Sequence, residues 1–287
     1  MIEPIARKLN FPDEAIASLV ECERKMISNA ADELCKAEIS LFAPDDSEFM
    51  ALLAQVSEKS GVNRYVCDMV FLLRCTVPLY DKYVAAGYND ELFYHTMSDL
   101  RVKLFECKEV NGVWGMEPTS WFKKYYMLER FRLGRMQYDK KEFPIDRYKA
   151  ILKMGDTIIS CHIPSDGPLL PEDVKESLRM AYRFFPEVHR DGKLAVCCFS
   201  WLLFAPLFRD YDENTNIKKF YNLFENIENW EEETNSNFWH VFGVRYSPEA
   251  LENAPQDNSL RRRVIEHLKN GGTMGNGAGI IFVDENY

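Results

Sequence analysis

The stretch that decides the fold is Asp156–Phe185, DTIISCHIPSDGPLLPEDVKESLRMAYRFF. The segment Thr157–Ile163 is rich in β-branched residues, and its alternation puts Ile158, Ser160 and His162 on one face and the other residues on the opposite face, which predicts a β-strand. The turn-forming segment Pro164–Pro168 ends that strand. Pro171 and the acidic residues that follow it favour the first turn of an amphipathic helix. A helix that starts just beyond a strand leaves unpaired backbone N–H groups, which can bind an anion such as phosphate, although most such units bind nothing.

The composition is that of a soluble globular protein with one large domain or two ordinary ones. The chain has 287 residues, of which 46% are hydrophobic, enough for a substantial core. The net charge of −10 argues against a surface for nucleic acid or for anionic membranes. It says little about small substrates.

The cysteines and the N-terminus favour a cytoplasmic protein. The first residues, MIEPIARKLNFPDEAI, lack the long apolar run and small-residue cleavage site of a signal peptide. No apolar run reaches the roughly 18 residues that a membrane span needs. The eight cysteines show no CxxC spacing and the five histidines no HExxH spacing. We therefore expect reduced thiols and no metal site.

The first 112 residues predict an α-helical domain. Apolar residues recur three and four positions apart over 13–42, which is typical of one long helix. Asn63 and Asn89 are placed to cap later helices, and Pro78 should kink or end the helix that contains it. No strand pattern occurs before Gly112. Residues 1–112 are therefore expected to form a helical domain with short connections.

Residues 113–287 predict a mixed α/β domain. The run Arg130–Asp139 resembles one strand with Gly134 in its middle, where a glycine often marks a bulge. The segment 143–154 is ambiguous between a strand and a turn. Further strands are expected at 157–163, 194–204, 237–243 and 278–283, and helices at 171–185, 215–227 and 258–271. The predicted fold class is α+β, an α-helical N-terminal domain followed by a mixed α/β domain.

The common catalytic and nucleotide-binding motifs are missing. The chain has no Walker loop, no GxGxxG after a strand, no GxSxG elbow and no protein-kinase motifs. The glycine-rich segment Asn270–Gly279 follows a predicted helix and precedes a predicted strand, so a helix stop and a turn explain it.

Several stretches resemble a known family in the same order. They are FRLGRMQYD (131–139), CHIPSDGPLLPEDVKESLRMAYRFF (161–185), CFSWLLFAPL (198–207), TNIKKF (215–220) and DNSLRRRVIEHLKNGG (257–272). Together they are similar to bacterial acyltransferase domain-containing proteins, which carry a helical N-terminal domain and a C-terminal domain like that of GCN5-related N-acetyltransferases (GNAT). In that family a histidine often precedes the Ser-Trp pair. This chain has Phe199 there, so that position carries no acid–base group.

The resemblance implies a layout for acyl-CoA. Two neighbouring parallel strands, here 157–163 and 194–204, would part and admit the pantetheine arm. Ile163 and the turn residues Ser165, Asp166 and Gly167 would then hold the pyrophosphate at the following helix start. The turn departs from the family's basic pattern, because Asp166 is acidic and the next basic residue along the chain is Lys175.

The resemblance also implies direct attack of an amine on the thioester, which needs a proton acceptor and a proton donor. His162 suits the acceptor, since histidine titrates near neutral pH; its alternative role is a hydrogen bond that stabilises the turn. Ser200 and Tyr211 are the candidate donors, and Tyr221 is a further one. Cys198 lies in an apolar run that disfavours a thiolate nucleophile.

Arg135 and Gln137 are expected to line the substrate cleft, with cross-strand pairing as their alternative role. The acceptor would be a small-molecule amine or a peptide. Three functions stay open on this reasoning: an acyl-CoA-dependent N-acyltransferase, a catalytically inactive relative that binds a ligand or partner in the same cleft, and a structural protein that self-associates.

Overall fold

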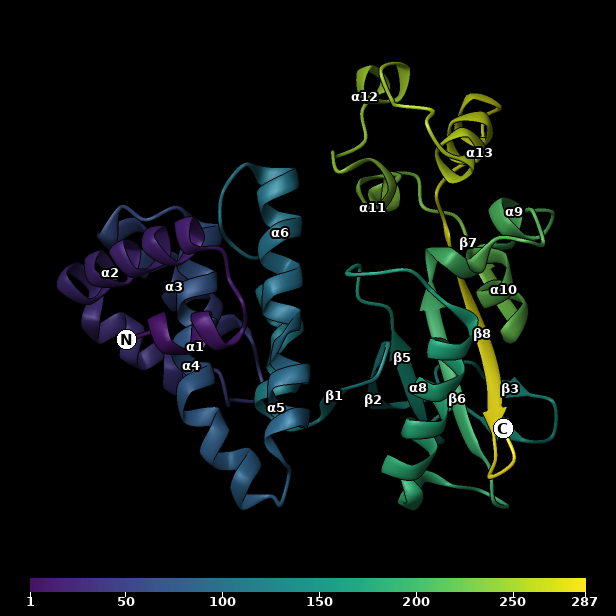
Figure 1. The fold of residues 1–287 in the computed structure, drawn as a ribbon, viewed down its shortest axis with the longest axis horizontal. Helices are drawn as coiled ribbons and strands as arrows, with labels where there is room; N and C mark the ends of the chain where they lie inside the picture. The colour runs from purple at the N-terminus through teal and green to yellow at the C-terminus, as the bar shows by residue number, and fades with distance from the viewer. The chain divides into compact units, whose positions relative to one another are not determined.

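The computed structural model describes all residues, 1–287, and divides them into two compact units, Met1–Phe131 and Arg132–Tyr287. Each unit is described by itself. The first is helical and the second is built on a sheet (Figure 1). The α+β class with a helical first part is therefore confirmed. No helix in either unit has an apolar stretch long enough to cross a bilayer.

The first unit consists of helices joined by short connections. They are α1 (Glu3–Lys8), α2 (Asp13–Ser40), α3 (Ser47–Ser60), α4 (Arg64–Ala85), α5 (Asp90–Met97), α6 (Asp99–Asn111), the 3₁₀ helix η1 (Thr119–Phe122) and α7 (Lys123–Tyr126). The side chains of Asn63 and Asn89 cap α4 and α5, as the sequence predicts. Pro78 does not end α4, which continues to Ala85. A kink lies instead in α2, at Ala30.

Residues 113–131 fold with the helices, beyond the boundary at 112 that the sequence predicts. The hydroxyl of Thr119 donates to Asp68 at 2.6 Å, and that of Tyr126 donates to the Leu72 carbonyl at 2.7 Å. Phe122 and Tyr126 are almost completely buried. The aromatic cluster of this segment therefore completes the helical core.

The second unit is a six-stranded sheet, a two-stranded hairpin and flanking helices. Its strands are β1 (Arg130–Leu133, which straddles the unit boundary), β2 (Met136–Glu142), β3 (Arg147–Tyr148), β4 (Leu152–Lys153), β5 (Thr157–His162), β6 (Leu194–Ser200), β7 (Glu225–Trp230) and β8 (Asn276–Val283). Its helices are α8 (Pro171–Phe184), α9 (Ala205–Phe208), α10 (Asn216–Leu223), α11 (Trp239–Phe242), α12 (Pro248–Glu252) and α13 (Ser259–Lys269), with short 3₁₀ turns η2 (Pro186–Val188), η3 (Trp201–Leu203) and η4 (Ser236–Phe238).

The strand order in the large sheet is β1-β2-β5-β6-β8-β7. β5 and β6 are parallel, whereas β2, β8 and β7 each run antiparallel to a neighbour. The helix α8 connects the two parallel strands, as a crossover connection requires. In Figure 1, α8 overlies these central strands, and α11, α12 and α13 gather beyond the end at which β8 begins.

The two faces of the sheet carry different side chains. On one face, Tyr138 of β2 packs against α8, where its hydroxyl lies 2.9 Å from Ser177 Oγ. The opposite face holds an apolar cluster that the β3–β4 hairpin completes: Phe143, Tyr148, Leu152, Ile158, Ala195, Cys197 and Ile280. Toward the end of β5 the same face is polar. There Gln137 and Asp139 of β2 lie directly opposite His162 and Ser160 of β5, and directly opposed residues share a face.

Three sequence predictions of secondary structure are wrong. Arg130–Asp139 is a hairpin of two strands, because Gly134 has a φ of +66° and turns the chain at Arg135. The predicted strand 237–243 is helical, formed by η4 and α11. Residues 225–230, assigned partly to a helix, form the edge strand β7.

Candidate active site

The pairing of the two parallel strands stops before either strand's last residue. It runs from Ile159 opposite Val196 to Cys161 opposite Cys198. β6 nevertheless continues to Ser200, hydrogen-bonded only to β8 on its other side. Pro164, just past β5, has no N–H to extend the ladder. The carboxyl ends of β5 and β6 are therefore unpaired with each other, as the resemblance implies.

A histidine–carboxylate pair lies at this point. His162 Nε2 is 3.2 Å from Asp139 Oδ2. The Asp139 side chain is 1% exposed and that of His162 is 21% exposed. A buried carboxylate fixes the orientation of an imidazole and stabilises its protonated form, while the partly exposed ring can still meet a substrate. Asp139 was not among the residues that the sequence singled out.

Gln137 lies directly opposite His162 on the neighbouring strand. Gln137 is only 2% exposed, and its side-chain Nε2 has no hydrogen-bond partner. A buried N–H donor left unpaired costs about 1–3 kcal/mol. Such a group in a folded protein calls for an explanation, and a ligand is one of the usual ones.

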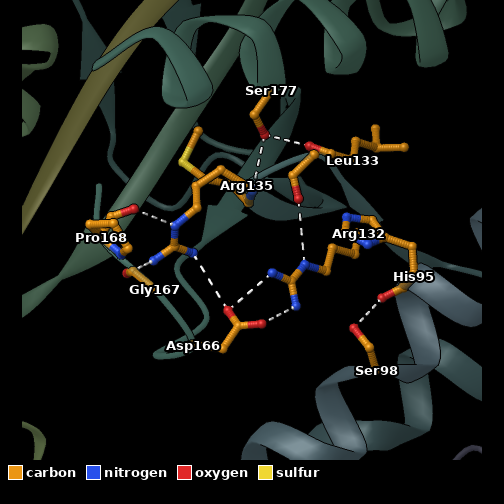
Figure 2. Close-up of polar contacts among 11 residues, drawn as sticks. His95, Ser98, Arg132, Leu133, Arg135, Asp166, Gly167, Pro168 and Ser177 are labelled. Carbon is orange, nitrogen blue, oxygen red and sulfur yellow. Dashed lines mark hydrogen bonds and ion pairs between the residues drawn. The ribbon is translucent and has the colours of Figure 1, made fainter. Parts of the chain in front are cut away.

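The segment between β5 and α8 is braced by two arginines (Figure 2). Arg132 Nη1 and Nη2 donate to Asp166 at 2.7 and 3.0 Å. Arg135 Nε donates to the Pro168 carbonyl at 2.9 Å and its Nη2 to the Gly167 carbonyl at 2.6 Å. Lys175 is still the next basic residue along the chain, but the fold brings these two arginines to the turn from a segment that is distant in sequence.

The charges at this turn nearly balance. Burial on its own would raise the pKa of Asp166, but the hydrogen bond from Arg132 and the charges of Arg132 and Arg135 lower that pKa below its ordinary value. Burial lowers the pKa of Arg135. Its Nη1 is 3.9 Å from Asp166 Oδ1 and has no hydrogen-bond partner. The first turn of α8 adds the carboxylates of Glu172 and Asp173, so the two arginines leave no positive excess there.

The start of α8 has no side-chain cap, in contrast to α10 and α13, which Thr215 and Asn258 cap. Ile163 and Ser165 precede it in the same connecting segment. A Cβ added at Gly167 would meet no atom within 4 Å. The uncapped helix start, the open backbone at Gly167 and the unpartnered Nη1 of Arg135 together favour an anion there.

The two candidate hydroxyls lie in different places. Ser200 is the last residue of β6, where its Oγ accepts from the Leu202 N–H at 3.2 Å and starts η3. The Tyr211 hydroxyl lies 2.9 Å from Ser259 Oγ, at the first turn of α13. Ser200 thus shares the strand ends with His162, whereas Tyr211 anchors a helix.

The thiols and the position before the Ser-Trp pair are packing residues. Contact with Cys198 and burial raise the pKa of Cys161 well above that of an ordinary thiol, and burial raises that of Cys197 to about 12. Phe199 packs against the apolar cluster, with Lys141 Nζ 4.1 Å from its ring centre. None of these groups offers a nucleophile at neutral pH.

This sheet, with parallel central strands that part above an uncapped helix start, is the architecture of a GNAT-like transferase domain. Residues 130–281 match the family model of the GNAT-like C-terminal domain. Residues 2–128 match that of the N-acyltransferase N-terminal domain. The protein belongs to this N-acyltransferase family, which confirms the resemblance found in the sequence.

Solved structures with the same fold are acyltransferases. One, in complex with decanoyl-CoA and teicoplanin, is 22% identical over 98% of this chain and 99% of its own, with a TM-score of 0.66. Another, an acyltransferase mutant in complex with octanoyl-CoA, is 22% identical over 98% of each chain, with a TM-score of 0.65. The curated proteins contain no significant match.

Proposed function

We propose that the protein transfers an acyl group from acyl-CoA to an amine. The observation that carries this proposal is the early end of the β5–β6 pairing beside the Asp139–His162 pair. The family supports it. So do the complexes of similar structures with decanoyl-CoA and octanoyl-CoA.

In this proposal the connecting segment from Ile163 to Gly167 and the start of α8 hold the pyrophosphate. Ser165 and Gly167 contribute backbone N–H groups, and Asp166 keeps the turn in shape through Arg132. Arg135 holds two carbonyls of the turn and keeps one N–H unused. The pantetheine arm would then add to the unpaired ends of β5 and β6 as an extra strand does.

The chemistry needs one proton accepted and one donated. His162 accepts the proton of the attacking ammonium, and Asp139 stabilises the resulting imidazolium. The amine nitrogen bonds to the thioester carbon and the C–S bond breaks. The nitrogen then gives up its second proton, which balances the proton that the CoA thiolate takes up. Ser200 is the better-placed donor, because the Tyr211 hydroxyl is paired with Ser259.

The acceptor in this proposal is an amine on a small molecule or a peptide. One similar acyltransferase was solved with teicoplanin, which makes a bulky acceptor a reasonable first candidate. We also place the protein in the cytoplasm, since all eight cysteines are unpaired thiols, as is usual in reducing compartments.

A second candidate function is a catalytically inactive relative that binds the same ligand. Phe199 favours it, because that side chain packs in the apolar cluster and cannot transfer a proton. The two candidates differ in turnover and not in binding.

Calorimetry with octanoyl-CoA and decanoyl-CoA tests the proposal first. We expect heat of binding and a raised Tm with at least one of them; neither signal with either ligand would reject it. CoA release in the presence of a panel of amines then separates the candidates. Turnover that is lost in His162→Gln supports the enzyme, and binding without turnover for every amine supports the inactive relative.

A further inference from the structure

Gln137 is a buried polar side chain that the chemistry above leaves unused. Its Nε2 has no hydrogen-bond partner although the residue is only 2% exposed. Directly opposed residues of antiparallel strands project to the same face, with Cβ atoms about 4.5–5.5 Å apart. The amide therefore lies beside the imidazole of His162. That imidazole is engaged by Asp139, two residues farther along the same strand.

We propose that the Gln137 amide donates a hydrogen bond to the thioester carbonyl oxygen of the bound acyl-CoA. The inference rests on the proposed acyl transfer and adds a catalytic residue to it. When the amine nitrogen bonds to the carbonyl carbon, an electron pair of the C=O bond moves onto oxygen. The Gln137 N–H donates a hydrogen bond to that negatively charged oxygen and stabilises it. The pair then returns to the carbon as the C–S bond breaks and the thiolate leaves.

The position of the amide selects the carbonyl over other parts of acyl-CoA. The phosphates belong to the turn at Gly167, which Arg135 braces. Gln137 lies two residues after Arg135, on strand β2 and opposite the proposed base His162. A base and a donor on one face can serve the amine and the carbonyl oxygen of the same carbon. A donor that is fixed before the ligand arrives stabilises developing charge without reorganisation.

The test compares two ligands that differ only at the carbonyl. Octanoyl-CoA has the thioester oxygen, and S-octyl-CoA is the thioether without it. In Gln137→Met, we expect octanoyl-CoA to bind about three- to tenfold more weakly than in the wild type, the loss of one hydrogen bond. S-octyl-CoA should bind equally to both proteins. Calorimetry gives both constants without knowledge of the acceptor.

Infrared spectra of octanoyl-CoA labelled with ¹³C at the carbonyl give a second readout. A hydrogen bond lowers the C=O stretching frequency, so the bound ligand should absorb at lower frequency in the wild type than in Gln137→Met. Gln137→Glu keeps the size of the side chain and replaces the donor with an acceptor, and it should lose the same shift. It serves if the methionine variant does not fold.

An equal loss of affinity for both ligands in Gln137→Met would overturn the inference, because it would mean that Gln137 acts on the shape of the site. Unchanged binding of both ligands together with an unchanged C=O frequency would also overturn it. Failure of the wild type to bind either ligand is a different result, since it rejects the proposed function itself.

Discussion

Among single residues, the Asp139–His162 pair carries the proposed chemistry. The carboxylate is buried and the imidazole is partly exposed, so each group has the surroundings that its role needs. The pair depends on strand register, because Asp139 reaches the ring of His162 from the adjacent strand β2.

A double-mutant cycle tests this pair. Asp139→Asn should lower the rate of acyl transfer by about a hundredfold or more, in the range of general acid–base catalysis, because the ring loses its orientation and its counter-charge. His162→Gln should cost at least as much. Because the two residues act as a unit, the double variant should be no slower than His162→Gln alone. Additive losses would show that they act independently.

The Arg132–Asp166 ion pair predicts a pH-dependent difference in stability. The lowered pKa of Asp166 means that its charged form stabilises the fold at neutral pH, and that this stability is lost as pH falls from the unfolded value of about 3.9 through the folded one. Asp166→Asn should therefore lower the free energy of unfolding by about 1–3 kcal/mol at pH 7. Denaturant titrations should show the gap closing below about pH 4. A gap that persists in acid would contradict the assignment.

Among the elements, the β1–β2 hairpin decides which side chains reach the site. Its turn residue Gly134 has a φ of +66°, and a Cβ there would lie 3.2 Å from Met180 Sδ of α8. Without this turn, Arg132 and Arg135 could not both reach the segment after β5.

Gly134→Ala should cost about 1–2 kcal/mol of stability, the penalty of a left-handed backbone for an L-residue. Gly167→Ala is the matched control, since nothing lies within 4 Å of a Cβ there and its φ is not positive. It should change the free energy of unfolding by no more than about 0.5 kcal/mol. Equal losses in the two variants, measured by urea denaturation, would remove the argument.

The strand-turn-helix unit at 157–184 could be predicted from the sequence, because its alternation, prolines and glycine act locally. The hairpin was missed since Gly134 within an apparently continuous strand pattern fits a bulge equally well. Asp139, Arg132 and the contact of Arg135 with the turn were missed for another reason. Their contacts join residues such as Arg132 and Asp166, 34 positions apart, and only strand register brings them together. Gln137 was named, but its unpaired amide depends on the same register.

At the scale of the whole molecule, the boundary between the two units along the chain lies within β1, after Phe131, and not at residue 112. The reason is the burial of Phe122, Tyr125 and Tyr126 in the helical unit. These side chains belong to its core as much as the helices do.

Truncation tests that boundary. A fragment of residues 1–131 should unfold cooperatively on heating, whereas one of residues 1–112 lacks the aromatic side chains of the core and should not. Circular dichroism melting curves provide the comparison. Cooperative unfolding of the shorter fragment with an equal Tm would place the boundary back at 112.

The central claim is that acyl-CoA enters between the unpaired ends of β5 and β6. A crystal structure of the protein with decanoyl-CoA tests it most directly. We expect the pantetheine arm beyond the Cys161–Cys198 pair, the pyrophosphate at Gly167, and the thioester beside His162 and Gln137. Decanoyl-CoA bound elsewhere, or β5 and β6 paired through Ser200 with the ligand excluded, would contradict the account.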